Sequence, residues 1–330
     1  MRAVVCTKWG TPDDLRLGSV PEPLPRDSEV VIEVAVCTAN FADVLMIGGN
    51  YQTRPALPFT PGLEAAGTVV HAPPQSNLRE GDRVVAFLWH GGFAEKVCAA
   101  AVETFAIPPR MPFEHAAALT STYASAALAI VHSGRLEPSD TLLVLGAGGG
   151  AGSAAVQIGK ALGARVIAVA SSPEKQSQAH DCGADLVIGS LEADWQARVM
   201  SGTGGRGVDV CFDPVGGRQS GDALAALAWG GRHIIFGFAS GEIPAIKLNR
   251  LLVRNRALLG SSLRHYRLHD PERLRATMAQ LFEWWEQGGL RPCITRRYPL
   301  GGTAAALRSI AERRAIGKIA IFVDETAMVE

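Results

Sequence analysis

A run of seven small residues, 146–152, separates an apolar segment from a helix-like segment. The apolar residues 142–145 predict a buried strand, and residues 153–160 predict a helix. Glycines at such a junction let the backbone approach a diphosphate, and the N–H groups of the helix N-terminus favour an anion. The sequence therefore predicts either a flexible turn or, as we expect, a dinucleotide-binding turn whose contact residues are Gly149, Gly150, Ala151 and Gly152.

The surrounding sequence favours the dinucleotide site. Gly146, Gly148 and Ala151 fit the pattern G-x-G-x-x-[GA], and a second β-rich run at 165–170 completes a βαβ unit of about 30 residues. Such strand-like runs alternate with helix-like segments, which is typical of a doubly wound parallel sheet. We therefore expect a six-stranded Rossmann domain with strands at 142–145, 166–170, 186–188, 208–212, 233–236 and 257–259.

The end of the second strand indicates which nicotinamide cofactor is bound. An acidic residue there bonds the adenosine ribose 2′-hydroxyl and repels a 2′-phosphate. Here the strand end carries Ser171 and Ser172, and Lys175 follows in the next turn. Two hydroxyl groups and a cation can bind the 2′-phosphate, so the sequence favours NADPH (NADP+) as the cofactor. The alternative is that Ser172 only caps the helix that starts with Pro173.

The rest of the chain has other patterns. Strand-like segments at 30–36, 67–70 and 83–87 are separated by Pro and Gly, which predicts a β-rich region. After Pro112 the pattern changes to a helix over 113–133. Near the C-terminus we expect a strong helix at 271–287 and a last strand at 319–323 that returns to the first domain.

Composition indicates an ordinary globular chain. With 330 residues and 47% hydrophobic content, it can build two domains with proper cores. The N-terminal apolar run is short, and residues 116–131 are interrupted by hydroxyl side chains, so we expect a cytoplasmic protein without signal peptide or membrane anchor. The six cysteines are dispersed without a C-x-x-C motif, which predicts reduced thiols in ordinary packing.

Charge is unevenly distributed along a chain whose net charge is zero. Residues 247–318 contain 15 Lys and Arg against 5 Asp and Glu. A basic segment can bind nucleic acid or an anionic ligand, but these residues are spread over several foldable elements. A solvated face or a dimer rim accounts for them better, so we expect no nucleic-acid partner.

Several motifs together resemble one family. They are residues 40–45 (NFADVL), 49–51 (GNY), 57–67 (LPFTPGLEAAG), 140–160, 213–217 (DPVGG), 230–232 with 236–238, and 317–318. They resemble the medium-chain dehydrogenase/reductase superfamily, and within it the zinc-free quinone oxidoreductase branch that includes zeta-crystallin. The resemblance covers essentially the whole chain.

The resemblance implies an α/β protein with two domains. One is a GroES-like, β-rich catalytic domain, residues 1–123 completed by 264–330. The other is a Rossmann NADP(H)-binding domain, residues 124–263. The chain departs from the family pattern at Gly148, where Ala or Ser is usual, and at 189–190, where Gly-Ser replaces an Asn-Tyr pair. A homodimer through the edge of the Rossmann sheet is also implied.

Family resemblance also implies roles for single residues. Asn40 and Tyr51 face the nicotinamide end of the cleft and donate to the acceptor oxygen; alternatively, Asn40 ties down its loop and Tyr51 is a packing wall. Thr122 starts the bridging helix and touches the nicotinamide region, or it caps and packs. The remaining cofactor contacts implied are Val215, Phe236, Gly237, Phe238, Leu263 and, as a compensating phosphate ligand, Arg314.

No metal site is expected. Zinc relatives use a cysteine near the position of Asn40 and a histidine where Leu63 stands; leucine cannot ligate and an amide is a poor zinc ligand. Hydride transfer from NADPH then needs an acceptor that is already electrophilic, such as a quinone or an α,β-unsaturated carbonyl. An enoyl-thioester reductase is the second hypothesis. A weakly catalytic NADPH-binding protein, crystallin-like or RNA-binding, is the third.

Overall fold

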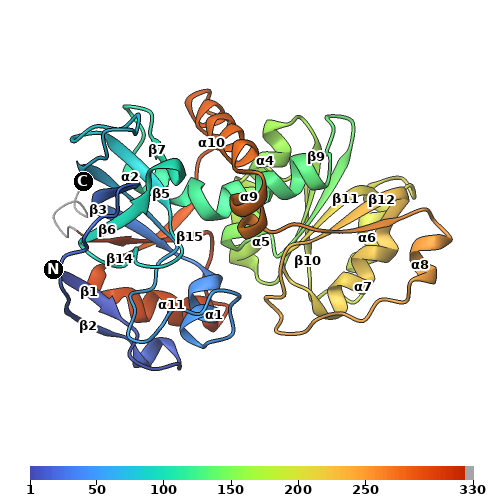
Figure 1. Ribbon diagram of the computed structural model, residues 1–330. Helices are drawn as coiled ribbons and strands as arrows, with labels where there is room; N and C mark the ends of the chain where they lie inside the picture. Colours follow the sequence, from blue (N-terminus) through green and yellow to red (C-terminus); the bar gives the residue numbers. More distant parts are fainter. Residues whose placement is uncertain (324–330) are drawn as a thin grey trace. The chain divides into compact units, whose positions relative to one another are not determined.

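The computed structural model describes residues 1–323. Within them the chain forms two compact units: unit 1 is Met1–Ser121 together with the chain from Ile294 onward, and unit 2 is Thr122–Cys293. Figure 1 shows the helices and strands of each unit. None of the described helices is both long enough and apolar enough to cross a membrane.

Residues 264–293 belong to unit 2, whereas the expected division returned the chain to the first domain at residue 264. The physical reason lies in α10 (Pro271–Glu286), which packs against α3 (Ala124–Ala127) and buries Leu274, Met278 and Leu281. The hydrophobic stripe of this helix therefore completes the core of unit 2.

Unit 1 is built on a mostly antiparallel sheet, as the Pro- and Gly-punctuated segments predicted. The described strands run in the order β14-β15-β3-β4-β5-β7, with β6 also paired to β3. The expected last strand is β15, which pairs antiparallel with β3 and so returns the chain to the first domain. The small strands β1 and β2 pair separately.

The elements of unit 1 have the following bounds. The strands are β1 (Arg2–Val5), β2 (Arg16–Ser19), β3 (Glu29–Ala39), β4 (Glu64–His71), β5 (Arg83–Phe87), β6 (Lys96–Ala100), β7 (Thr104–Ala106), β14 (Ile294–Pro299) and β15 (Lys318–Phe322). The α-helices are α1 (Phe41–Ile47), α2 (Phe113–Ala118) and α11 (Thr303–Ala311), and short 3-10 turns are formed by Pro12–Asp14, Ala101–Glu103 and Leu300–Gly302.

Unit 2 contains the predicted Rossmann sheet. Its described strands run in the order β10-β9-β8-β11-β12-β13, and every neighbouring pair is parallel. In chain order this is 3-2-1-4-5-6, so the topological switch lies between β8 and β11, where open α/β sheets bind ligands at their carboxyl ends. The six-stranded prediction is confirmed.

The elements of unit 2 match the predicted alternation. The strands are β8 (Thr141–Leu145), β9 (Arg165–Ala170), β10 (Leu186–Gly189), β11 (Val208–Asp213), β12 (Leu227–Ile235) and β13 (Ala257–Gly260). The helices are α3 (Ala124–Ala127), α4 (Gly150–Ala161), α5 (Pro173–Asp181), α6 (Trp195–Gly202), α7 (Gly217–Ala226), α8 (Asn249–Leu252), α9 (Leu263–His269) and α10 (Pro271–Glu286).

The helix predicted over 113–133 is present but not regular. Two π-helical turns, Leu119–Tyr123 and Leu128–Ser133, lie on either side of α3. Thr122 therefore lies inside a π-helical turn and does not start a helix. π-Turns inside α-helices often occur at functional sites.

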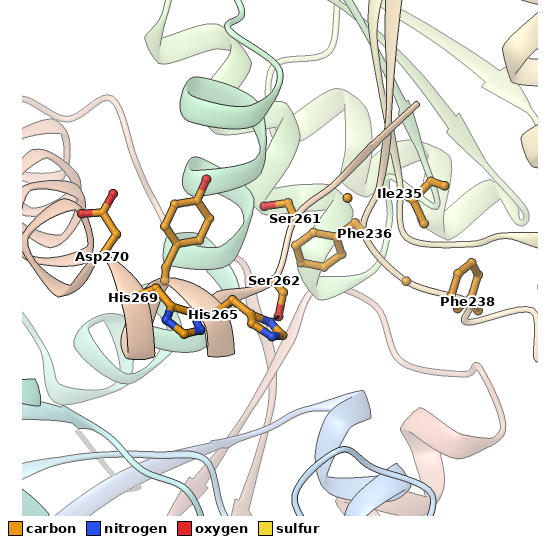
Figure 2. A pocket seen from close by; sticks show the side chains of 11 residues that line it. Ile235, Phe236, Phe238, Ser261, Ser262, His265, His269 and Asp270 are labelled. Atoms are coloured by element: carbon orange, nitrogen blue, oxygen red, sulfur yellow. Dashed lines mark hydrogen bonds between the residues drawn. The ribbon is translucent and has the colours of Figure 1, made fainter. Parts of the chain in front are cut away.

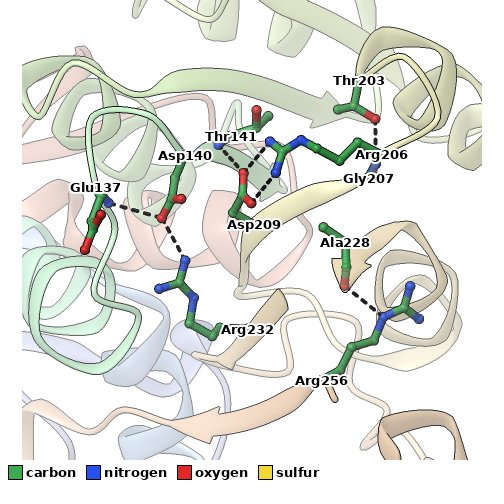
Figure 3. A network of polar contacts seen from close by, with 10 residues as sticks. All are labelled: Glu137, Asp140, Thr141, Thr203, Arg206, Gly207, Asp209, Ala228, Arg232 and Arg256. Carbon is green, nitrogen blue, oxygen red and sulfur yellow. Dashed lines mark hydrogen bonds and ion pairs between the residues drawn. The ribbon is translucent and has the colours of Figure 1, made fainter. Parts of the chain in front are cut away.

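Salt bridges fasten the amino-terminal ends of the Rossmann strands, opposite the ligand-binding edge (Figure 3). Arg206 holds Asp209 with two hydrogen bonds of 2.6 and 2.7 Å, and Asp209 accepts from the backbone N–H of Thr141 at 2.7 Å. Arg232 contacts Asp140 at 2.7 Å. Bidentate and networked pairs of this kind stabilise more than isolated surface pairs.

Candidate functional site

The glycine-rich turn joins β8 to the N-terminus of α4. Gly146 has φ +60°, a left-handed conformation that favours glycine, and a Cβ on Gly152 would lie 2.2 Å from the carbonyl oxygen of Gly146. Gly149 is the N-cap residue, and Ser153 donates the helix's first backbone bond to its carbonyl oxygen at 2.8 Å. The N–H groups of residues 150–152 lie before this first backbone bond of the helix. N–H groups at this place in a helix can bind an anion.

Gly148 lies directly against Lys175, which explains its departure from the family pattern. A Cβ on Gly148 would lie 2.4 Å from Cβ of Lys175 and 2.7 Å from its Cα. The first turn of α5 thus packs on the glycine turn so closely that Ala or Ser has no room. The fold brings Lys175, predicted for the 2′-phosphate, next to the turn predicted for the diphosphate.

Ser171 and Ser172 take different places at the end of β9. Ser172 is the N-cap of α5, and its Oγ accepts from the backbone N–H of Lys175 at 3.4 Å. Its hydroxyl also lowers the pKa of Glu174. Ser172 therefore caps α5, and Ser171 is exposed beside it.

Asp213 organises the other side of the switch point. It lies buried at the end of β11 and accepts from the backbone N–H groups of Val215 and Gly216 at 2.9 Å each, from Ser220 Oγ, and from His233 Nε2 at 3.0 Å. Burial raises the pKa of Asp213, but the His233 and Ser220 hydrogen bonds outweigh it and hold the pKa below its ordinary value. The motif 213–217 was noted in the sequence, but the organising role of its aspartate was missed.

Val215 packs against the glycine turn. A Cβ on Gly146 would come within 2.9 Å of Cγ2 of Val215. Gly216 follows with φ +73°, and a Cβ there would lie 2.8 Å from Cδ1 of Phe238. The loop held by Asp213 thus connects the glycine turn to the segment after β12.

An open pocket of about 640 Å³ lies at the carboxyl ends of β12 and β13 (Figure 2). Its aromatic wall includes Phe236 and Phe238, and α9 contributes His265 and His269. The two imidazole rings stack with their centroids 5.8 Å apart. The other lining residues are Ile235, Gly237, Gly260, Ser261, Ser262, Tyr266 and Asp270.

Three of the predicted contacts, Phe236, Gly237 and Phe238, line this pocket, and Leu263 is not among its lining residues. Phe236 also packs on the buried Phe212, with ring centroids 4.6 Å apart. Its ring therefore contacts the hydrophobic core and also lines the pocket. Leu263 is the first residue of α9 and is half-buried. The histidines of α9 were not predicted, although their spacing of four residues places them on one helix face.

Unit 1 contains a buried polar cluster around Asn40. Its Oδ1 accepts from Lys318 Nζ at 2.7 Å, and its Nδ2 donates to Glu64 Oε1 at 2.8 Å and to the Thr38 carbonyl oxygen at 3.2 Å. Glu64 also accepts from Thr38 Oγ1 and from the backbone N–H of Ser121. Both amide hydrogens of Asn40 therefore have protein acceptors, which supports the alternative that Asn40 holds its own loop.

Asp43 adds a second carboxyl group to this cluster. It accepts from the backbone N–H of Asn40 at 2.9 Å and of Gly62 at 3.2 Å. Burial, followed by the charge of Glu64, raises the pKa of Asp43 to about 7. Burial also lowers the pKa of Lys318, against the opposing effect of Glu64. The cluster was not predicted from the sequence, because only folding brings Glu64 and Lys318, which are 24 and 278 residues from Asn40, to this loop.

The three remaining residues that were predicted for the site lie in different parts of the structure. Tyr51 is half-buried and packs against the hydrophobic core of unit 1. Thr122 is buried in the first π-helical turn. Arg314 is exposed on unit 1, where its guanidinium pairs with Glu312 at 2.5 to 2.7 Å.

Leu63, in the position of a family zinc ligand, belongs to the hydrophobic core of unit 1. Across residues 1–323, no three or more His, Cys, Asp or Glu side chains are grouped so as to hold a metal ion.

Comparisons with known proteins agree with both units. Residues 26–109 match the alcohol dehydrogenase GroES-like domain, and residues 150–284 match the family described as zinc-binding dehydrogenase. The chain is 36% identical to the quinone oxidoreductase-like protein 2 homolog of Nematostella vectensis, over 97% of this chain and 88% of that protein. It is 32% identical to the quinone oxidoreductase of Sus scrofa, over 98% of each chain.

A solved structure is also similar. The Escherichia coli quinone oxidoreductase complexed with NADPH has a TM-score of 0.91 and 27% identity, over 98% of this chain and 100% of that one. Together with the parallel sheet, the glycine turn and the GroES-like unit, these matches show that the chain belongs to the quinone oxidoreductase-like family of the medium-chain dehydrogenase/reductase superfamily.

Proposed function

We propose that this protein is an NADPH-dependent reductase that transfers hydride to a quinone or an α,β-unsaturated carbonyl compound without zinc. The observation that carries the proposal is the contact between Gly148 and Lys175 at the switch point of the Rossmann sheet. It packs the helical turn that carries Lys175 against the glycine turn, at a position where Gly148 has no room for a side chain. A phosphate-rich dinucleotide is the ligand that such an arrangement favours.

The residues of unit 2 fit NADPH. The N–H groups of residues 150–152 would hold the diphosphate, and Lys175 with the exposed Ser171 would hold the 2′-phosphate. Val215, Phe236, Gly237 and Phe238 would border the rest of the cofactor. When bound, NADPH supplies the hydride, and the chain's own residues orient the acceptor and exclude water.

The pocket beside Phe236 and Phe238 suits a flat, conjugated acceptor. Its aromatic wall offers stacking surfaces, and His265 and His269 are polar groups that can donate hydrogen bonds to a carbonyl oxygen. A histidine at such a position can also supply the proton that a reduced quinone or enone takes up. Tyr51 and Thr122 are proposed to assist at the acceptor, and Asn40 to position its loop.

Two observations support zinc independence. Leu63, which occupies a family ligand position, is part of the apolar core of unit 1. Asn40, near a second ligand position, has its amide bonded to Lys318 and Glu64. A tetrahedral zinc site needs donors that neither residue offers.

Unit 2 presents an edge that fits a second copy of the chain. β13 is the last strand of the described Rossmann sheet, and large apolar side chains in the segment leading to it are exposed: Leu248, Leu252 and Val253. An unpaired strand edge beside exposed apolar side chains favours pairing. We propose that the protein forms a homodimer through this edge.

The experiment that tests the function follows NADPH and NADH oxidation by EDTA-treated protein with three acceptor classes: quinones, simple enones and enoyl thioesters. The proposal expects turnover with quinones or enones that prefers NADPH and survives EDTA. Turnover with the thioesters alone would indicate the enoyl reductase instead. Tight NADPH binding without turnover on any acceptor would favour a non-catalytic protein.

A further inference from the structure

Two cysteines of unit 2 contact each other although 111 residues separate them. Sγ of Cys182 lies 2.9 Å from Sγ of Cys293, and both are free thiols. The sulfurs of a disulfide are about 2.05 Å apart, so a bond between these two requires a movement of less than about 1 Å. The sequence predicted reduced thiols in ordinary packing; these two are free thiols, but the direct contact between their sulfurs was not predicted.

A buried glutamine holds the two sulfurs together. Gln157 of α4 makes two hydrogen bonds with the backbone of Arg291. Its Nε2 donates to the Arg291 carbonyl oxygen at 2.7 Å, and its Oε1 accepts from the Arg291 N–H at 2.8 Å. The same Nε2 lies 3.1 Å from Sγ of Cys293 and 3.6 Å from Sγ of Cys182. One side chain therefore fixes the segment that carries Cys293 against the end of α5, where Cys182 is the C-cap residue.

Their surroundings make the two thiols unequal. The hydrogen bond between the two thiols, assisted by Gln178 and Gln157, lowers the pKa of Cys182, and the same bond raises the pKa of Cys293. Burial instead raises the pKa of the other four thiols, Cys6, Cys37, Cys98 and Cys211. Nε2 of Gln178 lies 3.4 Å from Sγ of Cys182 and can donate to a thiolate there. Since the thiolate is the reactive form, we assign Cys182 as the nucleophile of the pair.

We propose that Cys182 and Cys293 form a dithiol site that is oxidised to a disulfide by hydroperoxides. The Cys182 thiolate attacks one oxygen of hydrogen peroxide, the O–O bond breaks, and the leaving hydroxide takes up a proton to give water and a sulfenic acid on Cys182. The Cys293 sulfur then attacks the sulfenic sulfur. The S–O bond breaks, a second water leaves with the Cys293 proton, and the S–S bond forms.

Overall, two thiols and one hydrogen peroxide give one disulfide and two water molecules. The product ties the end of α5 to the segment that follows α10. The helix α5 begins with the Ser172 cap and Lys175, so the bond anchors the helix that carries the proposed phosphate ligand. The site does not depend on the proposed reductase activity, because its residues lie outside the pocket lining and the glycine turn.

The test treats the full-length protein with hydrogen peroxide, then counts free thiols in denaturant and maps cross-linked peptides by mass spectrometry. Matched variants are C182S and C293S, with C98S as the control, because Cys98 has no cysteine partner among the described contacts. We expect wild type and C98S to lose two thiols per chain, to become lighter by two hydrogens, and to yield a peptide joined through Cys182 and Cys293. A reductant restores both thiols.

The variants separate the two steps. C293S is expected to stop at the sulfenic acid on Cys182, which dimedone traps, and C182S to lose its thiols more slowly than wild type. Far-UV circular dichroism establishes that each variant folds; if one does not, the wild-type peptide map decides. The proposal is overturned if oxidised wild type contains no Cys182–Cys293 peptide, or if the C182S variant loses its thiols as fast as wild type.

Discussion

Nζ of Lys318 lies 2.7 Å from Oδ1 of Asn40, although 278 residues separate them. Lys318 is the first residue of β15, the strand that pairs with β3, and Asn40 follows β3 directly. The contact therefore fastens the returning C-terminal strand to the loop that starts α1. Glu64, 3.7 Å from the same ammonium group, balances its charge in a site that excludes water.

Removing one charge of this buried pair should destabilise unit 1 strongly. Lys318→Met leaves Glu64 without its cation, and the loss of one partner of a buried ion pair costs about 3–5 kcal/mol. The double variant K318M/E64Q should be less destabilised than the sum of the two single changes. Urea unfolding of wild type, the two single variants and the double variant measures this coupling energy. A coupling energy below about 1 kcal/mol would contradict the buried ion pair.

Asp43 should make the protein less stable as the pH rises toward neutrality. Its pKa is about 7 in the folded protein and 3.8 ordinarily. Between these values the folded state holds a proton that the unfolded state has released, so this group's contribution to the free energy of unfolding falls as the pH rises. At about 1.4 kcal/mol per pKa unit, the whole window corresponds to about 4 kcal/mol.

Asp43→Asn removes that dependence. The free energies of unfolding of wild type and D43N are measured in urea at several pH values from 4 to 8. As the pH rises, wild type should lose stability relative to D43N. A constant loss from the altered hydrogen bonds leaves this slope unchanged. A difference that is flat over this range would show that Asp43 does not titrate there.

Gly148→Ala should disturb the glycine turn, whereas Gly149→Ala should not. A methyl group on Gly148 meets the backbone of Lys175 at 2.7 Å, but on Gly149 its nearest contact is the Gly146 carbonyl oxygen at 3.5 Å. Overpacking of this kind costs about 1–3 kcal/mol. Thermal unfolding of the two variants without cofactor provides the comparison, and equal stability of both would contradict the packing.

How much the sequence predicts depends on how local each feature is. The strand, glycine turn and helix at 141–161 follow one another directly, so the Rossmann half could be predicted nearly element by element. The contacts Lys318–Asn40 and Cys182–Cys293 could not, because tertiary folding alone brings such distant residues together. The π-helical turn around Thr122 was missed because its residues have the same composition as an ordinary buried helix.

Replacing Lys175 should reduce the preference for NADPH. Lys175→Met removes the cation proposed for the 2′-phosphate, and a hydrogen bond to a charged group contributes about 1.5–3 kcal/mol, or roughly ten- to hundredfold in affinity. We expect KM for NADPH to rise by about that factor while KM for NADH stays unchanged. Arg314→Met tests the compensating phosphate ligand that the family resemblance implies; because its guanidinium pairs with Glu312, we expect both values to stay unchanged. If R314M shows the loss and K175M does not, the phosphate ligand is misassigned.

Leu252→Glu should weaken the proposed dimer. Leu252 ends α8 and its side chain is largely exposed in the single chain. A charge placed there opposes burial against a second copy. Analytical ultracentrifugation should show a dimer for wild type and a larger monomer fraction for L252E, with unchanged far-UV circular dichroism. A monomeric wild type would overturn the dimer proposal.

A single-turnover experiment tests whether NADPH bound to this protein gives its hydride to the acceptor without zinc. EDTA-treated protein saturated with NADPH is mixed with a quinone or an enone in a stopped-flow instrument, and NADPH deuterated at either C4 position is compared with unlabelled cofactor. We expect rapid loss of nicotinamide absorbance that is slowed by deuterium at one C4 position only. Bound NADPH that is not oxidised by any acceptor, or that reacts only after zinc is added, would contradict it.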